Sequence, residues 1–147
     1  MEDNYEIVTI EAGTFYYKNG NIHREDGPAV EEYNGTKHWY INRKRHRDNG
    51  PAIEYYNGTK EWYKNGILHR EDGPAVETYR GHKVWYCNGL RHREDGPAFE
   101  YASGYKAWFI NDKCITEEVN EWMTSNNIPD YKEWTNKEIA QFKLKFL

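Results

Sequence analysis

The sequence predicts a mainly β protein: an antiparallel meander of repeated β-hairpins in one elongated sheet, with a short C-terminal α-helical cap. Three observations predict this fold. The string HREDGPA occurs at residues 23–29, 69–75 and 92–98, and again as HRDNGPA at 46–52. Asn-Gly and Asp-Gly-Pro turn signals separate short runs of β-branched and aromatic residues. After residue 115 the spacing of apolar residues becomes helical.

The bulk composition limits the protein class. A chain of 147 residues has room for one domain, or for one repeat array with a cap. The net charge of -4 lacks the basic excess of duplex DNA-binding proteins, so we expect no duplex DNA partner. The acidic, polar opening and the absence of a long apolar run predict no membrane partner and a cytoplasmic location. Cys87 and Cys114 read as reduced thiols.

A period of 23 residues runs through most of the chain. It relates the histidines and the tryptophans of successive units, which we interpret as the structural repeat motif: His23, His46, His69 and His92, with Trp39, Trp62, Trp85 and Trp108. Each unit reads as strand, Asn-Gly turn, strand, Asn-Gly turn, short strand and Asp-Gly-Pro turn. The first hairpin, from about residue 5, lacks the Gly-Pro-Ala start and is interpreted as closing the array edge.

The register follows if both Asn-Gly loops have two residues. Ile53 then lies opposite Trp62, and Trp62 lies opposite His69, so that these three share one face and form the core stripe. The period repeats this arrangement in the other units: Val30, Trp39 and His46, then Val76, Trp85 and His92, and finally Phe99 and Trp108. The other face is predicted to be wetter and to carry Ala52, Glu54, Tyr56 and Tyr63, with Glu61 opposite Arg70.

The conserved-looking acid and base string invites a catalytic or metal-binding interpretation, but four near-identical copies favour a role that every unit needs. We expect each His to stack on the Trp of the neighbouring strand, the Arg to pair with acids, and Asp-Gly-Pro to form the turn. Equivalent histidines lie about 10 Å apart or more, too far to share a Zn ion. No nucleophile elbow or phosphate loop is present. The expectation is therefore no enzyme activity, no catalytic residues, no metal site and no cofactor.

The tail predicts two helices. Thr116 is expected as the N-cap of a helix to about Asn126, with Val119, Trp122 and Met123 on one side. Thr135 and Glu138 form a capping box that opens a second helix. Its apolar stripe is Ile139, Phe142 and Phe146. The domain division is thus residues 1–115 for the repeat array and 116–147 for a segment that caps the last strand or docks a partner.

The strings WYKNGILHREDGPAVE and YNGTKEWY resemble the MORN-like repeats of tailed bacteriophages and giant DNA viruses, over about residues 14–113. The closing YKEWTNKEIAQFKLKFL is similar to helical tails on some phage members. The resemblance implies an elongated hairpin sheet used as a scaffold or binding surface, in the host cytoplasm if the protein is viral. Other MORN repeats have a Gly-rich Tyr-x-Gly pattern and lack HREDGPA, so the membrane binding of those relatives is not carried over.

Two function classes compete with the enzyme reading. The first is a non-enzymatic module that binds a protein partner, in a specific form a phage inhibitor of a host defence protein. Its candidate contacts are six tyrosines, which equally could pack against one another along the sheet: Tyr33, Tyr40, Tyr56, Tyr63, Tyr79 and Tyr86. The alternative is a binder of nucleotides or single-stranded nucleic acid, with stacked aromatics and the repeat arginines Arg24, Arg47, Arg70 and Arg93. The sequence leaves the oligomeric state open.

Overall fold

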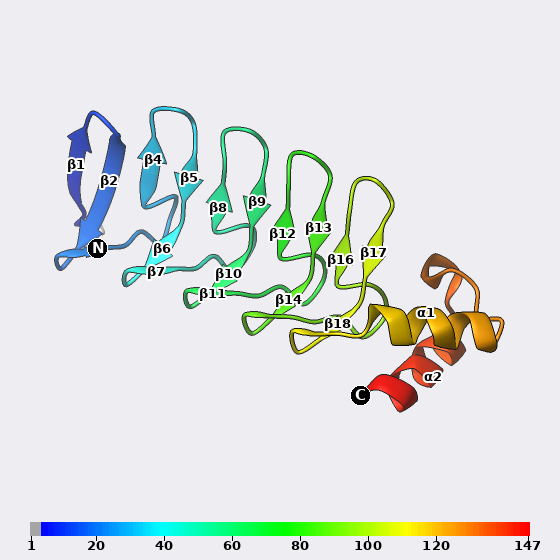
Figure 1. Cartoon of the computed structure of the whole chain (residues 1–147). Helices are drawn as coiled ribbons and strands as arrows, with labels where there is room; N and C mark the ends of the chain where they lie inside the picture. Colours follow the sequence, from blue (N-terminus) through cyan, green and yellow to red (C-terminus); the bar gives the residue numbers. More distant parts are fainter. Residues whose placement is uncertain (1–3) are drawn as a thin grey trace.

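The computed structural model describes residues 4–147 and confirms the mainly β fold with a helical end. Residues 1–3 lie outside the described residues. They belong to the acidic opening on which the expected absence of an export signal depends, and to the predicted repeat array. Successive hairpins stand side by side in a row, and two helices follow the last hairpin (Figure 1). The chain begins at one end of the row and ends beside the other.

The first hairpin pairs β1 (Glu6–Ile10) with β2 (Gly13–Lys18), and β3 (Asn21–Ile22) pairs with β2. At Gly13, φ is +151°, and a Cβ would lie 2.2 Å from the carbonyl oxygen of Glu31. Glycine is therefore required where β2 meets the next strand.

Each following unit contributes two hairpins. We call the first kind the tip hairpins: β4 (Val30–Glu32) with β5 (Lys37–His38), β8 (Ile53–Glu54) with β9 (Lys60–Glu61), β12 (Val76–Glu77) with β13 (Lys83–Val84), and β16 (Phe99–Glu100) with β17 (Lys106–Ala107). Together with β1, β2 and β3 they form one sheet of eleven strands in the order β1-β2-β4-β5-β8-β9-β12-β13-β16-β17, with β3 beside β2.

The second kind, the base hairpins, form four separate two-stranded sheets. They are β6 (Tyr40–Ile41) with β7 (Lys44–Arg45), β10 (Tyr63–Lys64) with β11 (Ile67–Leu68), β14 (Tyr86–Cys87) with β15 (Leu90–Arg91), and β18 (Phe109–Ile110) with β19 (Lys113–Cys114). Backbone hydrogen bonds nevertheless join neighbouring base hairpins. One example is the bond from the N–H of Gly66 to the C=O of Arg45, at 2.8 Å.

The two Asn-Gly turns of a unit differ, and this corrects the predicted register. In the base hairpin, Asn65 and Gly66 have φ of +52° and +84°, as a two-residue type I′ turn requires. In the tip hairpin only Gly58 has positive φ, at +89°, and the loop spans three residues between Tyr55 and Thr59. A type I turn followed by a left-handed Gly accounts for the extra residue.

The longer loop shifts the pairing by one residue. Ile53 lies opposite Glu61 and not opposite Trp62, so the predicted Ile53–Trp62 pair is wrong. The same shift places Val30 opposite His38, Val76 opposite Val84 and Phe99 opposite Ala107. The predicted neighbours Trp62 and His69 do pair, through a 3.1 Å bond from the His69 N–H to the Trp62 C=O.

The shift also corrects the predicted faces. Ala52, expected on the wetter face, is fully buried, as are the equivalent Ala29, Ala75 and Ala98. The C=O of Ala52 accepts the N–H of Trp39 in the preceding unit at 2.8 Å, and Ala75 accepts from Trp62 in the same way, so each alanine lies at the contact between neighbouring units. The interior of the array is therefore thin, with Val30 and Ile53 among its buried residues.

One face of the long sheet carries alternating charge. Glu and Lys face each other across successive strands, in the order Glu31, Lys37, Glu54, Lys60, Glu77, Lys83, Glu100 and Lys106. Opposite charges directly across an antiparallel pair are stabilising, whereas a one-residue slip would remove every pair. This ladder therefore helps to specify the register.

The helical end comprises α1 (Thr116–Ser125), the 3-10 turn η1 (Tyr131–Glu133) and α2 (Asn136–Phe146). The predicted capping box of Thr135 and Glu138 is present. The predicted N-cap role of Thr116 is wrong: it is the first helical residue, and its hydroxyl accepts the N–H of Trp108 at 3.0 Å. Ile115 holds the cap position without a side-chain bond.

The helices supply the thickest core of the described chain. Trp108 packs with Ile115 at the start of α1, with Val119 and Trp122 of α1, and with Phe142 of α2. Asp130 pairs with Lys106 of β17, where the Glu of a further unit would otherwise stand. Tyr131 donates to Glu100 of β16 at 2.5 Å. The segment therefore covers the last unit, as the capping interpretation predicts.

Candidate binding surfaces

Each repeat arginine clamps two neighbouring units. The Arg70 guanidinium lies over the Trp62 ring, 4.0 Å from its centroid. Its Nη1 donates to the Pro74 carbonyl at 3.1 Å and to Glu77 of β12 at 3.0 Å, and its Nε donates to Asp72 at 2.8 Å. The equivalent arginines lie on their aromatic rings at the same distance: Arg24 on Tyr16 at 3.9 Å, Arg47 on Trp39 at 3.9 Å and Arg93 on Trp85 at 4.0 Å.

The glycine of the motif makes room for this clamp. A Cβ on Gly73 would lie 3.0 Å from the Arg70 Cζ, so the guanidinium fits between the Trp62 ring and the glycine backbone. A side chain here would force the guanidinium to shift by a few tenths of an ångström.

The histidine has a different role from the predicted one. The Nδ1 of His69 accepts the backbone N–H of Asn88, in the next base hairpin, at 3.1 Å. Because Nδ1 accepts, a neutral ring carries its proton on Nε2, which faces Glu71 at 3.5 Å. The expectation that the imidazole stacks on the indole is therefore wrong: the neighbouring arginine occupies the ring face, and the histidine ties one unit to the next.

The other copies repeat this bond. Nδ1 of His23, His46 and His92 accepts the N–H of Asn42, Asn65 and Asn111, at 3.1, 3.1 and 3.3 Å. In the second copy, Asp48 stands at the position of the motif's Glu, and its Oδ1 lies 3.0 Å from the His46 Nε2, within hydrogen-bond distance. The predicted position of Glu61 opposite Arg70 is also wrong, since Glu61 lies opposite Ile53 and Val76 in the long sheet. Its carboxylate accepts from the hydroxyl of Tyr63 at 3.0 Å. The histidine and the arginine of each copy thus have partners in the neighbouring unit.

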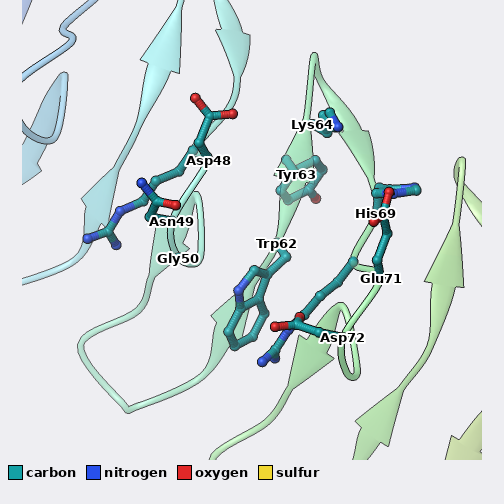
Figure 2. A pocket seen from close by; sticks show the side chains of 11 residues that line it. Asp48, Asn49, Gly50, Trp62, Tyr63, Lys64, His69, Glu71 and Asp72 are labelled. Atoms are coloured by element: carbon teal, nitrogen blue, oxygen red, sulfur yellow. The ribbon is translucent and has the colours of Figure 1, made fainter.

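Open grooves separate successive motif loops. Figure 2 shows one of them, with Asp48, Asn49 and Gly50 on one side and the next unit's Trp62, Tyr63, Lys64, His69, Glu71 and Asp72 on the other. Equivalent grooves lie before and after it in the row. Their walls mix both signs of charge, and the guanidinium groups already have acceptors. Among residues 4–147, no group of three or more His, Cys, Asp or Glu side chains could hold a metal ion.

The six candidate tyrosines fall into two groups. Tyr33, Tyr56 and Tyr79 stand at the first position of successive tip-hairpin loops and are 69%, 70% and 57% exposed. Tyr40, Tyr63 and Tyr86 open successive base hairpins and are half-buried. Neighbouring tips are two strands apart, so the exposed rings recur about every 10 Å along the sheet.

The backbone under the exposed tyrosines is fixed. The N–H of Tyr56 donates to the Thr36 hydroxyl of the preceding tip at 3.2 Å, and that of Tyr79 donates to the Thr59 hydroxyl at 3.1 Å. The N–H of Tyr33 bonds the C=O of Ala12 at 3.3 Å. These staples hold the loops at a constant spacing while the rings remain in solvent. Sequence reasoning missed them, although Thr36 and Thr59 do recur at the 23-residue period.

The half-buried group packs within the array. The Arg45 guanidinium lies between Tyr40 and Tyr63, 5.9 and 5.5 Å from their centroids. Burial raises the pKa of Tyr63 to about 12, assisted by the Glu61 carboxylate that accepts its O–H. For these tyrosines the packing alternative of the sequence analysis fits the geometry better than exposure to a partner.

Neither a scan of protein-family models nor a search of curated proteins finds a match to this chain. The MORN-like resemblance therefore stays a prediction. Within residues 4–147, no helix is both long enough and apolar enough to cross a membrane.

Proposed function

We propose that this chain is a non-enzymatic repeat module that binds a protein partner through the tyrosines of its tip hairpins. The observation that carries the proposal is the row of exposed rings at Tyr33, Tyr56 and Tyr79, each on a backbone stapled to its neighbour. Tyrosine supplies a large contact area and a polar hydroxyl, and it is enriched at binding hot spots. Prior ordering of the loops lowers the entropy lost on binding.

The contacts of the HREDGPA motif support a separation between residues that join the units and residues that bind a partner. The motif's arginines, histidines and acids bond one another and the neighbouring units, which accounts for four copies without a reaction. Binding then falls to the side chains that have no such structural use. The resemblance to phage repeats extends the proposal to a narrower form, in which the protein acts in the host cytoplasm and inhibits a host defence protein.

The alternative, binding of nucleotides or single-stranded nucleic acid, has less support. It needs the repeat arginines for phosphates, but Arg70 already donates to Asp72, Pro74 and Glu77. Binding of a labelled oligonucleotide that weakens with salt would favour this alternative.

The test compares partner capture by the wild-type chain with capture by a Tyr33→Ala, Tyr56→Ala, Tyr79→Ala triple variant. Leu144→Ala is the control, because Leu144 is 91% exposed on α2, away from the tips. We expect a partner that binds the wild type and the control and is lost with the triple variant, followed by confirmation with the purified partner in calorimetry.

The corresponding triple Tyr→Phe variant separates the ring from the hydroxyl. It should retain most of the affinity if ring contact dominates. A partner that binds the alanine triple variant as tightly as the wild type would contradict the assignment of the binding surface to the tips.

A further inference from the structure

The two edge strands of the long sheet, β17 and β1, have different surroundings. At the C-terminal end, Asp130 and Tyr131 of the helical segment contact Lys106 and Glu100 of the last tip hairpin. At the other end, β1 is the last strand of the sheet, and within residues 4–147 no segment pairs with its outer side. The first hairpin was predicted to close the edge of the array. Its strand β2 does pair with β4 of the next unit, but β1 is itself the edge strand of the described sheet.

The outer side of β1 presents backbone groups ready to pair. Ile7 lies opposite Tyr16, whose N–H and C=O bond Ala29 and His23, on the side away from β1. In an antiparallel ladder both members of such a pair turn their polar groups away from each other. The N–H and C=O of Ile7, and by alternation those of Thr9, therefore point outward.

This strand lacks the features by which natural edges avoid pairing. It has five residues, EIVTI, with no Lys and no Pro. Two of its apolar side chains, Ile7 and Ile10, are 60% and 53% exposed. At five residues it is also longer than any strand of the tip and base hairpins.

We propose that the outer edge of β1 pairs antiparallel with β1 of a second copy of this chain, with Val8 on the two-fold axis. Ile7 then faces Thr9 of the other copy, and each such pair exchanges two N–H···O bonds. Glu6 faces Ile10 of the other copy, so no like charges meet. The pairing joins the two long sheets into one and covers the exposed isoleucines.

The occupant follows from the strand itself. Antiparallel pairing places the Glu6 carboxylates of the two copies at opposite ends, and the outward N–H and C=O groups of Ile7 meet those of Thr9 in the second copy. A five-residue edge is smaller than a standard interface of about 1,600 Å², and we expect a dissociation constant on the order of micromolar. This inference is independent of the proposed partner, because the tip tyrosines stay exposed in the dimer.

The first test is sedimentation equilibrium of the full chain, tagged at its C-terminus, from about 1 µM to 1 mM. We expect a monomer–dimer equilibrium that Thr9→Pro weakens about tenfold or more, since proline removes an outward N–H and leaves the β1–β2 bonds intact. Ile7→Lys is a second disruptive variant in case Thr9→Pro does not fold, and Leu144→Lys is the control. A monomer at all concentrations, or a dimer insensitive to both edge variants, would overturn the proposal.

The second test reads the register in a chain whose Cys87 and Cys114 are replaced by serine. In the proposed pairing the two Val8 Cα atoms lie about 4.5 Å apart, within the range of a disulfide, whereas the two Ile10 Cα atoms lie roughly 14 Å apart. Val8→Cys should form a cross-linked dimer on mild oxidation, and Ile10→Cys should not. Equal cross-linking of both variants, or none at Val8→Cys, contradicts the proposed register.

Discussion

At the scale of residues, several side chains of HREDGPA together join neighbouring units. Arg70 covers the Trp62 ring and bonds the next strand, Asp72 orients the guanidinium, and Gly73 leaves space for it. His69 bonds the following base hairpin. A string that resembles an active site thus makes packing contacts and hydrogen bonds between units.

The side-chain partners were the least predictable part. Sequence alone indicated that the motif is structural, yet it assigned the ring contact to histidine and not to arginine. The long arginine side chain reaches back over the ring only because the Asp-Gly-Pro turn brings Gly73 behind it. Such a contact depends on three-dimensional reach, which spacing along a strand does not report.

A residue-scale prediction concerns two phenols. Burial raises the pKa of Tyr63 and of Tyr131 to about 12, and each donates its O–H to a glutamate, Glu61 and Glu100. Because the folded pKa lies above the unfolded value of about 10, this stabilisation is complete below pH 10 and is lost as the pH rises toward 12.

Ultraviolet titration of tyrosinate should therefore show a late-ionising component. Tyr63→Phe and Tyr131→Phe should each reduce the amplitude of this component. A late component that both substitutions leave unchanged would contradict the assignment.

At the scale of elements, turn type decides the register. The same dipeptide, Asn-Gly, forms a two-residue turn at Asn65-Gly66 and part of a three-residue loop at Asn57-Gly58. The sequence therefore predicts that hairpins form there, but it does not distinguish the two loops. The second helix was more predictable, because the Thr135 and Glu138 capping box is a local signal.

An element-scale prediction concerns docking of the helical end in acid. The Lys143 ammonium holds the pKa of Glu94 below its usual range, and Lys106 does the same for Asp130. Each folded pKa lies below the unfolded value, so the stabilisation is present above the ordinary carboxyl pKa of about 4 and is lost as the pH falls through the folded value.

Tryptophan fluorescence should report this loss, because Trp122 and Trp108 are buried in the core that the helices form with the last unit. We expect a shift in emission as the pH is lowered below about 4. A Glu94→Gln, Asp130→Asn double variant should show weaker docking at neutral pH and a smaller acid-induced change. An unchanged acid response in the double variant would exclude these two ion pairs as its cause.

At the scale of the whole molecule, the protein is a row of equivalent units, and the bonds described above join each unit to its neighbours. The 23-residue period made this predictable, and with it the antiparallel meander and the helical end. Stability in such an array is approximately a sum of unit terms and nearest-neighbour terms. Within residues 4–147, β1 is the last strand at one end of the sheet and the helices contact the last unit at the other, so the two ends of the row differ.

A whole-molecule prediction follows from the period. Deletion of residues 51–73 removes one complete unit and joins Gly50 to Pro74, which restores the Gly-Pro sequence of the motif. We expect a folded array one unit shorter, with cooperative urea unfolding at lower stability. Deletion of residues 51–72 is the control, because it leaves an extra glycine and shifts the pairing. Equal behaviour of the two deletions would contradict a 23-residue structural unit.

The central claim is that the heptapeptide joins neighbouring units and so stabilises the whole array. Urea unfolding of Arg70→Ala tests it most directly. Arg80→Ala is the control, because Arg80 is exposed and its guanidinium bonds Tyr79 in its own loop. The account predicts a loss of about 1–3 kcal/mol for Arg70→Ala, little recovery with Arg70→Lys, and a change within about 0.5 kcal/mol for Arg80→Ala. Equal stability of Arg70→Ala and the wild type would contradict it.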